Sequence, residues 1–103
     1  MALARERLGL PEGPRLKQNA PNPFNSGTII SWFQLQPGSA RLEVFALTGR
    51  RVAVLHEGRK EAGSHRLRWD GRDERGRSLA SGVYVYRLVM REAVQTRKLT
   101  LLR

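Results

Sequence analysis

The chain of 103 residues contains no cysteine, only two histidines and no apolar run long enough to cross a membrane as a helix. The absence of cysteine excludes disulfide bridges and thiolate metal sites. Residues 1–13 carry Glu6 and Glu12 and lack the apolar core of a signal peptide. If this domain is exported, we therefore expect another part of a longer protein to begin the process.

Acidic residues are also scarce. Nine Asp and Glu stand against nineteen Lys and Arg, and the net charge is +10. Such a charge suits an anionic partner, and lipopolysaccharide is one partner of this kind. The basic residues are nevertheless scattered singly along the chain, which is typical of a solvated β surface. We therefore expect no nucleic-acid partner.

Helical periodicity is absent beyond residues 2–8. Short segments that are rich in β-branched and aromatic residues, or that alternate apolar with polar residues, recur at regular spacing. The predicted strands are 28–35, 41–45, 51–55, 65–69, 83–90 and 96–102. About six or seven short strands with this spacing predict an all-β sandwich.

Two parts of unequal order are expected along the chain. Residues 1–17 are predicted to form a linker, disordered or with about two turns of helix that would be marginal alone. Residues 18–103 are predicted to form the folded domain. Both ends of such a domain lie at the surface, so it can be appended to a larger protein.

The alternation within the predicted strands indicates which side chains enter the core. Leu42 and Val44 are predicted to point inward, and Arg41 and Glu43 outward. In the strand 28–35 the alternation is imperfect, so either both faces are partly covered or a bulge changes the register. Gly49 is predicted to take a positive φ in a tight turn, and 57–64 is predicted to be a polar loop.

The sequence NAPNPFN, which we call the lead-in segment (Asn19–Asn25), precedes the first strand. Its two prolines restrict the backbone and push their preceding residues toward extended geometry. We expect this stiff segment to deliver Phe24 into the edge of the core and to aim the first strand. The alternative is a proline-rich ligand for a partner's groove.

Three possible chemical sites receive little support. The acids of the loop 70–82 are interleaved with arginines, so a turn in which Asp70 caps amides is favoured over a calcium site. Tyr84, Tyr86 and Trp32 are expected in an aromatic core, with a sugar-binding platform as the alternative. His65 is expected to be packed, and no nucleophile–base set is evident. We predict no enzyme, cofactor or metal.

Four stretches together resemble a known family. The patterns are N-x-P-N-P-F-N, W-D-G-x-D-x-x-G, S-G-x-Y and a final K-x-x-L-L-R, and the resemblance covers about residues 16–103. They resemble the C-terminal sorting domain of type IX secretion substrates and the related Ig-like domain of the flagellar hook-capping protein FlgD. Ala46, where aspartate is common, and Gly27, where a more restrictive residue is usual, depart from the pattern.

The resemblance implies an Ig-like antiparallel sandwich of about seven strands and a non-catalytic module of a longer exported protein. It implies export through the periplasm to the medium or the cell surface, with outer-membrane secretion machinery and a passenger domain as partners. The implied partner-recognition residues are Lys98, Leu101, Leu102 and Arg103. The implied structural-motif residues are Asn19, Pro21, Asn22, Pro23, Phe24, Asn25, Gly49, Arg50, Trp69, Asp70, Gly71, Asp73, Gly76, Ser81, Gly82 and Tyr84. A structural Ig-like spacer, a hook-capping domain and a carbohydrate-binding module remain alternatives.

Overall fold

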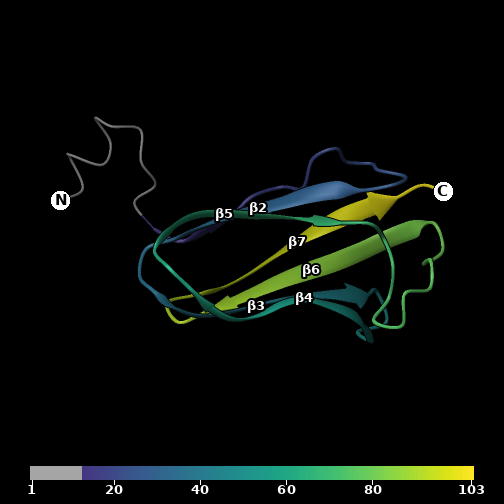
Figure 1. The fold of residues 1–103 in the computed structure, drawn as a ribbon. Coiled ribbons are helices and arrows are strands. Elements are labelled where there is room, and N and C mark those ends of the chain that lie inside the picture. The colour runs from purple at the N-terminus through teal and green to yellow at the C-terminus, as the bar shows by residue number, and fades with distance from the viewer. Residues whose placement is uncertain (1–12) are drawn as a thin grey trace.

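The computed structural model describes residues 13–103, which form seven β-strands (Figure 1). The strands are β1 (Arg15–Leu16), β2 (Thr28–Gln34), β3 (Gly38–Ala46), β4 (Arg51–Lys60), β5 (Gly63–Trp69), β6 (Gly82–Met90) and β7 (Val94–Leu101). The described part of the chain contains no helix that is long and apolar enough to span a membrane. The predicted all-β class and strand number are confirmed.

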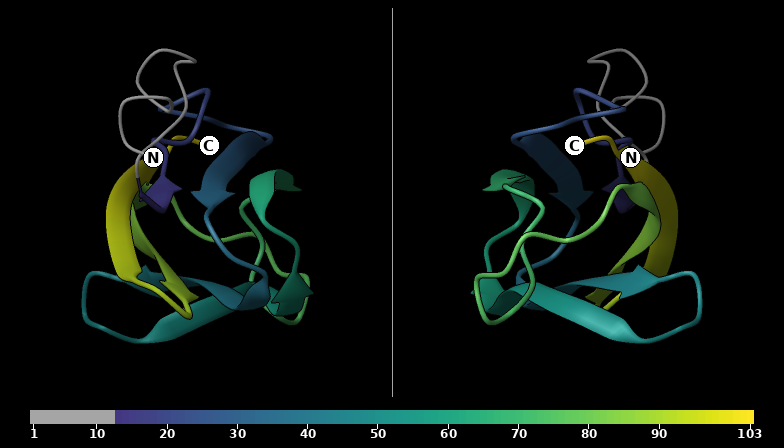
Figure 2. Two further views of the ribbon diagram at one scale, coloured as in Figure 1. Left: turned by 90° about the vertical axis from the view of Figure 1, so that its left-hand side faces the viewer. Right: turned by 90° about the vertical axis from the view of Figure 1, so that its right-hand side faces the viewer.

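The strands are arranged in two antiparallel sheets, with the order β1-β2-β5 in one and β4-β3-β6-β7 in the other. Viewed along the long axis, the two sheets face each other across the core (Figure 2). β3 and β6 are the central strands of the larger sheet, and each is paired on both sides. The chain is therefore an Ig-like sandwich, as expected.

The core consists of the inward-facing residues of both sheets. In β6 the alternation places Tyr84, Tyr86, Leu88 and Met90 inside. Trp32 and Tyr86 are almost fully buried, so the expected aromatic core is confirmed and the alternative of a sugar-binding aromatic platform is wrong. His65 packs beside Trp32, with ring centroids 5.4 Å apart.

The predicted boundary between linker and domain is wrong at its C-terminal end. Leu16 belongs to β1, pairs with Trp32 and is buried in the core. Its backbone N–H donates to Gln95 Oε1 (2.6 Å), and its carbonyl accepts Arg97 Nε (2.6 Å). Side chains of β7 thus hold this two-residue strand, a contact that no local pattern indicates. The rest of the predicted linker, residues 1–12, lies outside the described residues.

The predicted loop 57–64 is also wrong. β4 continues to Lys60, β5 begins at Gly63, and the two residues between them make the turn. The polar residues of this stretch remain in a strand because the backbone pairs with β3, from Gly38↔Lys60 to Arg41↔Glu57. A strand at the edge of a sheet can carry polar side chains on its solvent face without losing its ladder.

Glu43 lies on the outer face of the larger sheet, as the alternation predicted, but it is only 3% exposed. Three arginines cover its carboxylate, with N–O distances of 3.2 Å to Arg41, 3.2 Å to Arg51 and 3.1 Å to Arg87. Burial raises the pKa of Glu43, but these partners, Arg87 foremost, lower it below its ordinary value overall. Glu43 is buried although it faces outward, because long arginine side chains from its own strand and from both neighbouring strands fold over the carboxylate.

The structure of β2 decides whether its imperfect alternation reflects partial cover of both faces or a bulge. Its inward residues are buried, while Ile29 and Phe33 on the other face are half-buried, and its pairing with β5 shows no register shift. Both faces are therefore partly covered. The register shifts occur between β3 and β4. Gln34, an unexpected buried polar residue, accepts a hydrogen bond from Trp32 Nε1 (3.2 Å).

Candidate recognition site

The motif segments, distant in the sequence, meet at the end of the sandwich where the C-terminus lies (Figure 1). Phe24 of the lead-in segment packs against Trp69 with ring centroids 5.8 Å apart. Trp69 in turn meets Tyr84 edge-on at 6.5 Å. Phe24 is buried, so the expectation that the lead-in segment delivers it into the core is confirmed. We call this part of the molecule the terminal end.

The lead-in segment joins the two sheets. At its start, Ala20 pairs with Ile29 of the smaller sheet, with hydrogen bonds of 2.8 and 3.1 Å. At its end, Phe24 pairs in parallel with Leu101 of the larger sheet. Asn22 Oδ1 accepts the backbone N–H of Thr100 between these two bridges (2.9 Å). Its stiffness therefore fixes the relative placement of both sheets at this end.

Asn19 anchors the start of the lead-in segment. Its buried side chain donates to Thr28 Oγ1 (3.0 Å) and to the carbonyl of Pro21 (3.2 Å). Its backbone N–H donates to the Tyr86 hydroxyl (2.8 Å), which donates to the carbonyl of Lys17 (2.7 Å). Burial raises the pKa of this hydroxyl above its ordinary value despite the bond from Asn19. The peptide bonds before Pro21 and Pro23 are cis.

Arg103 ties three motif segments together, with its guanidinium bound to backbone carbonyls and its backbone N–H bound to Ser81. Its Nη2 donates to Gly71 O (2.7 Å) and Asp70 O (3.4 Å), Nη1 donates to Asn25 O (3.2 Å), and Nε donates to Leu79 O (3.0 Å). Its backbone N–H donates to Ser81 Oγ (2.8 Å). The planar guanidinium presents five donors in fixed directions, which matches this set of acceptors.

Gly71 provides the space for Arg103. Its φ is +75°, a conformation that side chains rarely adopt, and a Cβ there would lie 2.8 Å from Arg103 Nη2 and 3.3 Å from Leu101 Cδ2. The glycine of W-D-G is thus required by its backbone and by its neighbours. Gly49 also has positive φ (+92°), as predicted, but open space surrounds its Cβ position.

The acids of the loop after β5 stabilise turns. Asp70 Oδ1 accepts the backbone N–H of Arg72 (3.2 Å), which confirms the predicted capping role. Asp73 accepts the backbone N–H groups of Arg75 and Arg77, both at 2.9 Å, and its pKa is lowered chiefly by the bond from Arg77. Within residues 13–103 no group of three or more potential metal ligands gathers. Gly76 closes the Asp73 turn, donating to Asp73 O (3.0 Å).

The four terminal residues expected to contact a partner occupy different environments. Leu101 is buried in the core, and the Arg103 guanidinium is engaged by carbonyls. Lys98 and Leu102 are exposed, Leu102 by 52%. Beside Leu102 lies an open hollow of about 360 Å³, lined by Pro21, Pro23, Phe24, Asn25, Ser26, Gly27 and Leu102. The exposed part of the terminal end is therefore made by both the lead-in segment and the terminal strand.

Arg68 belongs to this end, although its position in the sequence did not indicate it. Its Nη2 donates to the carbonyl of Ser26 (3.0 Å), and its guanidinium lies over Gly27, where a Cβ would collide with it. The unusual glycine at position 27 is the only sequence signal for this contact, because it leaves room for a side chain from β5. Gly82 opens β6 opposite Leu101.

The two antiparallel sheets, which face each other and are joined at the terminal end by the lead-in segment, define an Ig-like domain. The family model of the FlgD Ig-like domain matches residues 24–93, and the chain belongs to this family. A comparison with curated protein sequences gives no match.

Solved structures with the same fold include parts of much larger proteins. Dimeric latent PorU from Porphyromonas gingivalis matches with a TM-score of 0.70 at 19% identity, over 86% of this chain and 9% of PorU. PorZ from the same organism, described as an essential bacterial surface component of the type-IX secretion system, gives 0.59 at 21%, over 84% and 11%. The Pseudomonas fluorescens DNA glycosylase AlkC gives 0.51 at 16%, over 99% and 34%. At these identities the likeness concerns the fold.

Proposed function

We propose that this domain is a non-catalytic module that targets a larger exported protein to the outer-membrane type IX secretion machinery and to the cell surface. The observation that carries the proposal is the joining of all four motif segments at the terminal end. Arg103 alone contacts three of them by hydrogen bonds. A fold held in this way presents Leu102 and the exposed lead-in residues around one hollow, with exposed Lys98 four residues before Leu102.

Two further points support this function. Small parts of PorU and PorZ share this fold. PorZ is described as a component of the type-IX secretion system. The exposed residues Pro21, Pro23 and Asn25 lie on the same hollow as Leu102, so a partner could contact both ends of the motif set at once. The module would accompany its passenger through the periplasm, and anionic lipopolysaccharide would be the surface to which the exported protein is attached.

A reporter fusion tests the proposal. Residues 13–103 are fused to the C-terminus of a periplasmic reporter in a host with an active type IX system, and reporter in the medium and on the cell surface is measured. We expect export with the fusion and none with the reporter alone or in a host lacking the translocation pore. A folded fusion that stays in the periplasm would refute the proposal.

Deletion of Lys98–Arg103 is not a clean test of a terminal signal. Leu99 and Leu101 are buried core residues, so the deletion would remove part of the larger sheet. Loss of export would then report unfolding as readily as loss of recognition. Substitutions at the exposed residues Lys98 and Leu102 separate the two effects.

A structural Ig-like domain, as a spacer or in a hook cap, is the second candidate. The match to the FlgD Ig-like domain favours it, and that match covers residues 24–93, without most of the lead-in segment and without any of β7. A structural domain would fold equally well in the fusion but would leave the reporter in the periplasm, so the same experiment separates the candidates.

A further inference from the structure

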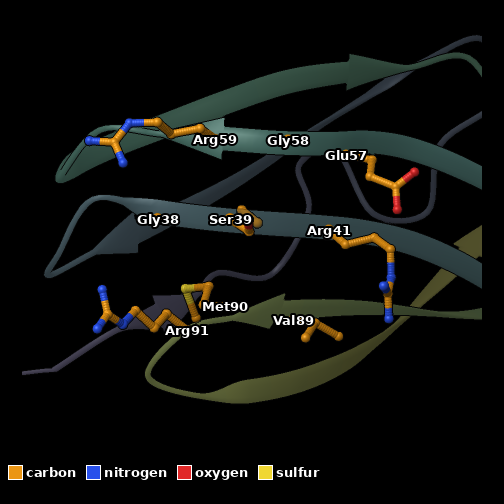
Figure 3. A pocket seen from close by; sticks show the side chains of 10 residues that line it. Gly38, Ser39, Arg41, Glu57, Gly58, Arg59, Val89, Met90 and Arg91 are labelled. Atoms are coloured by element: carbon orange, nitrogen blue, oxygen red, sulfur yellow. The ribbon is translucent and has the colours of Figure 1, made fainter.

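A second surface feature lies at the end of the sandwich opposite to the terminal end. It is a groove of about 690 Å³ on the outer face of the larger sheet, and it crosses β4, β3 and the end of β6 (Figure 3). β6 shows that the two ends differ, because Gly82 pairs with Leu101 at one end and Met90 borders the groove at the other. We call this feature the arginine groove.

The floor of the arginine groove is bare and rigid. Gly38, Ser39 and Gly58 provide almost no side-chain bulk there. Buried Gln34 holds this floor from beneath, because its Nε2 lies 3.2 Å from the carbonyl oxygens of both Gly38 and Lys60. The floor is therefore formed before any ligand arrives, and ordering it on binding would cost little.

The walls combine three arginines with one carboxylate. Arg59 extends from β4, Arg41 from β3, and Arg91 follows β6, while Glu57 stands beside Arg41 (Figure 3). Arg59 pairs only with exposed Glu61 (3.3 Å), a contact that contributes little and exchanges readily. Within residues 13–103, Arg91 has no acidic partner in salt-bridge range.

We propose that the arginine groove binds a saccharide that bears carboxylate or phosphate groups. Guanidinium groups bind both anions in a bidentate manner, so Arg59 and Arg91 provide two sites for them on opposite sides of the bare floor. Glu57 accepts hydrogen bonds from hydroxyl groups, which a sugar supplies in number. The volume suits a few sugar units. This site goes beyond the proposed function and does not depend on it.

Other anionic polymers fit less well. Nucleic-acid single strands require aromatic side chains for base stacking, and the groove is lined by none. An extended acidic peptide cannot add as a strand to β3, because in the groove β3 is paired on both sides. Poly-glutamate and single-stranded DNA also carry no hydroxyl groups along the chain to donate to Glu57.

The test uses five probes, each titrated into the 103-residue chain and followed by calorimetry and by two-dimensional NMR. Polygalacturonate carries carboxylates, a phosphomannan carries phosphates, dextran is the neutral control, and oligothymidine and poly-glutamate represent the other polyanions as one class. We expect micromolar to millimolar binding of the charged saccharides, whichever anion is preferred, with amide shifts at Gly38, Ser39 and Gly58. Tighter binding of either other polyanion, or shifts located elsewhere, would overturn the proposal.

Matched variants separate a site from general positive charge. Arg59→Gln/Arg91→Gln should weaken saccharide binding at least tenfold, whereas Arg66→Gln/Arg75→Gln, with the same net charge but exposed arginines outside the groove, should change it less than twofold. Glu57→Gln should weaken saccharide binding severalfold, although it adds positive charge. Equal losses in the two double variants, or tighter binding by Glu57→Gln, would show nonspecific electrostatic attraction and refute the site.

Discussion

The guanidinium of Arg103 rests on the carbonyl oxygen of Gly71, with Nη2 2.7 Å from that oxygen, and 32 residues of sequence separate the two. The same guanidinium also bonds to Asn25 and Leu79. The last residue of the chain is thus part of the packing of the terminal end.

Arg103→Ala should lower the free energy of unfolding by about 1–3 kcal/mol, because several carbonyls lose a charged donor. Arg103→Lys should recover only part of this, since an ammonium cannot reach the divergent acceptors as a planar fork does. Urea unfolding measures both. Leu102→Ala, at an exposed neighbouring site, is the control and should stay within about 0.5 kcal/mol. Full recovery by lysine would contradict the multi-carbonyl role.

Gly71→Ala should destabilise the fold by about 2–4 kcal/mol, since it adds a collision with Arg103 and Leu101 to an unfavourable backbone conformation. Gly49→Ala is the matched control, because φ is also positive there but the surroundings are open; it should cost about 1–2 kcal/mol. The loss of stability is measured by thermal unfolding for both variants. The difference between the two losses reports the collision with Arg103 and Leu101. Equal costs would mean that the collision is relieved freely.

Tyr86→Phe should cost about 1–3 kcal/mol, because it leaves the Asn19 N–H and the Lys17 carbonyl without their buried partner. Tyr84→Phe removes a hydroxyl that serves one acceptor, Ala80 O at 2.7 Å, and should cost about 1 kcal/mol or less. Denaturant unfolding with unchanged m-values would make the comparison valid. A larger loss for Tyr84→Phe would contradict the anchoring role of Asn19.

The ion-pair cluster around Glu43 should make stability depend on pH. Its pKa is lowered in the folded state, so the stabilisation is present above the unfolded value of about 4.3 and is lost as pH falls through that value toward the folded pKa. Glu43→Gln should cost about 1–2 kcal/mol at pH 7, since the arginines are partly exposed, and the difference should shrink as pH falls below the unfolded value toward the folded pKa. A difference that is constant with pH would disprove the linkage.

Much of the fold could be predicted from the sequence because alternation encodes strands directly. The strands around Val44 and Tyr86 have apolar residues at every second position, and both were predicted with their correct inward faces. The polar strand residues His56–Lys60 carry no such pattern, since an edge strand is held by backbone pairing with β3. Leu16 was missed because two residues give no periodicity and its partners lie about 80 residues away.

The terminal end could be predicted only as a set of motif residues. Their resemblance to a family selected Phe24, Trp69 and Gly71, and the structure brings these together. Alternation with Leu99 places Leu101 on one face and Leu102 on the other, and the structure buries Leu99 and Leu101 while Leu102 is exposed. Nothing in the sequence indicated that the Arg103 side chain would turn back onto carbonyls.

Substitutions of exposed residues test most directly whether secretion machinery contacts the exposed surface of the terminal end. Lys98→Glu/Leu102→Ser changes that surface, and Lys60→Glu/Val94→Ser makes the same charge reversal and a similar apolar-to-polar exchange at the opposite end, where Val94 is 61% exposed. Both variants should fold with thermal midpoints close to the parent. In the reporter fusion, the first should reduce export at least tenfold and the second less than twofold; equal export by both variants would contradict the account.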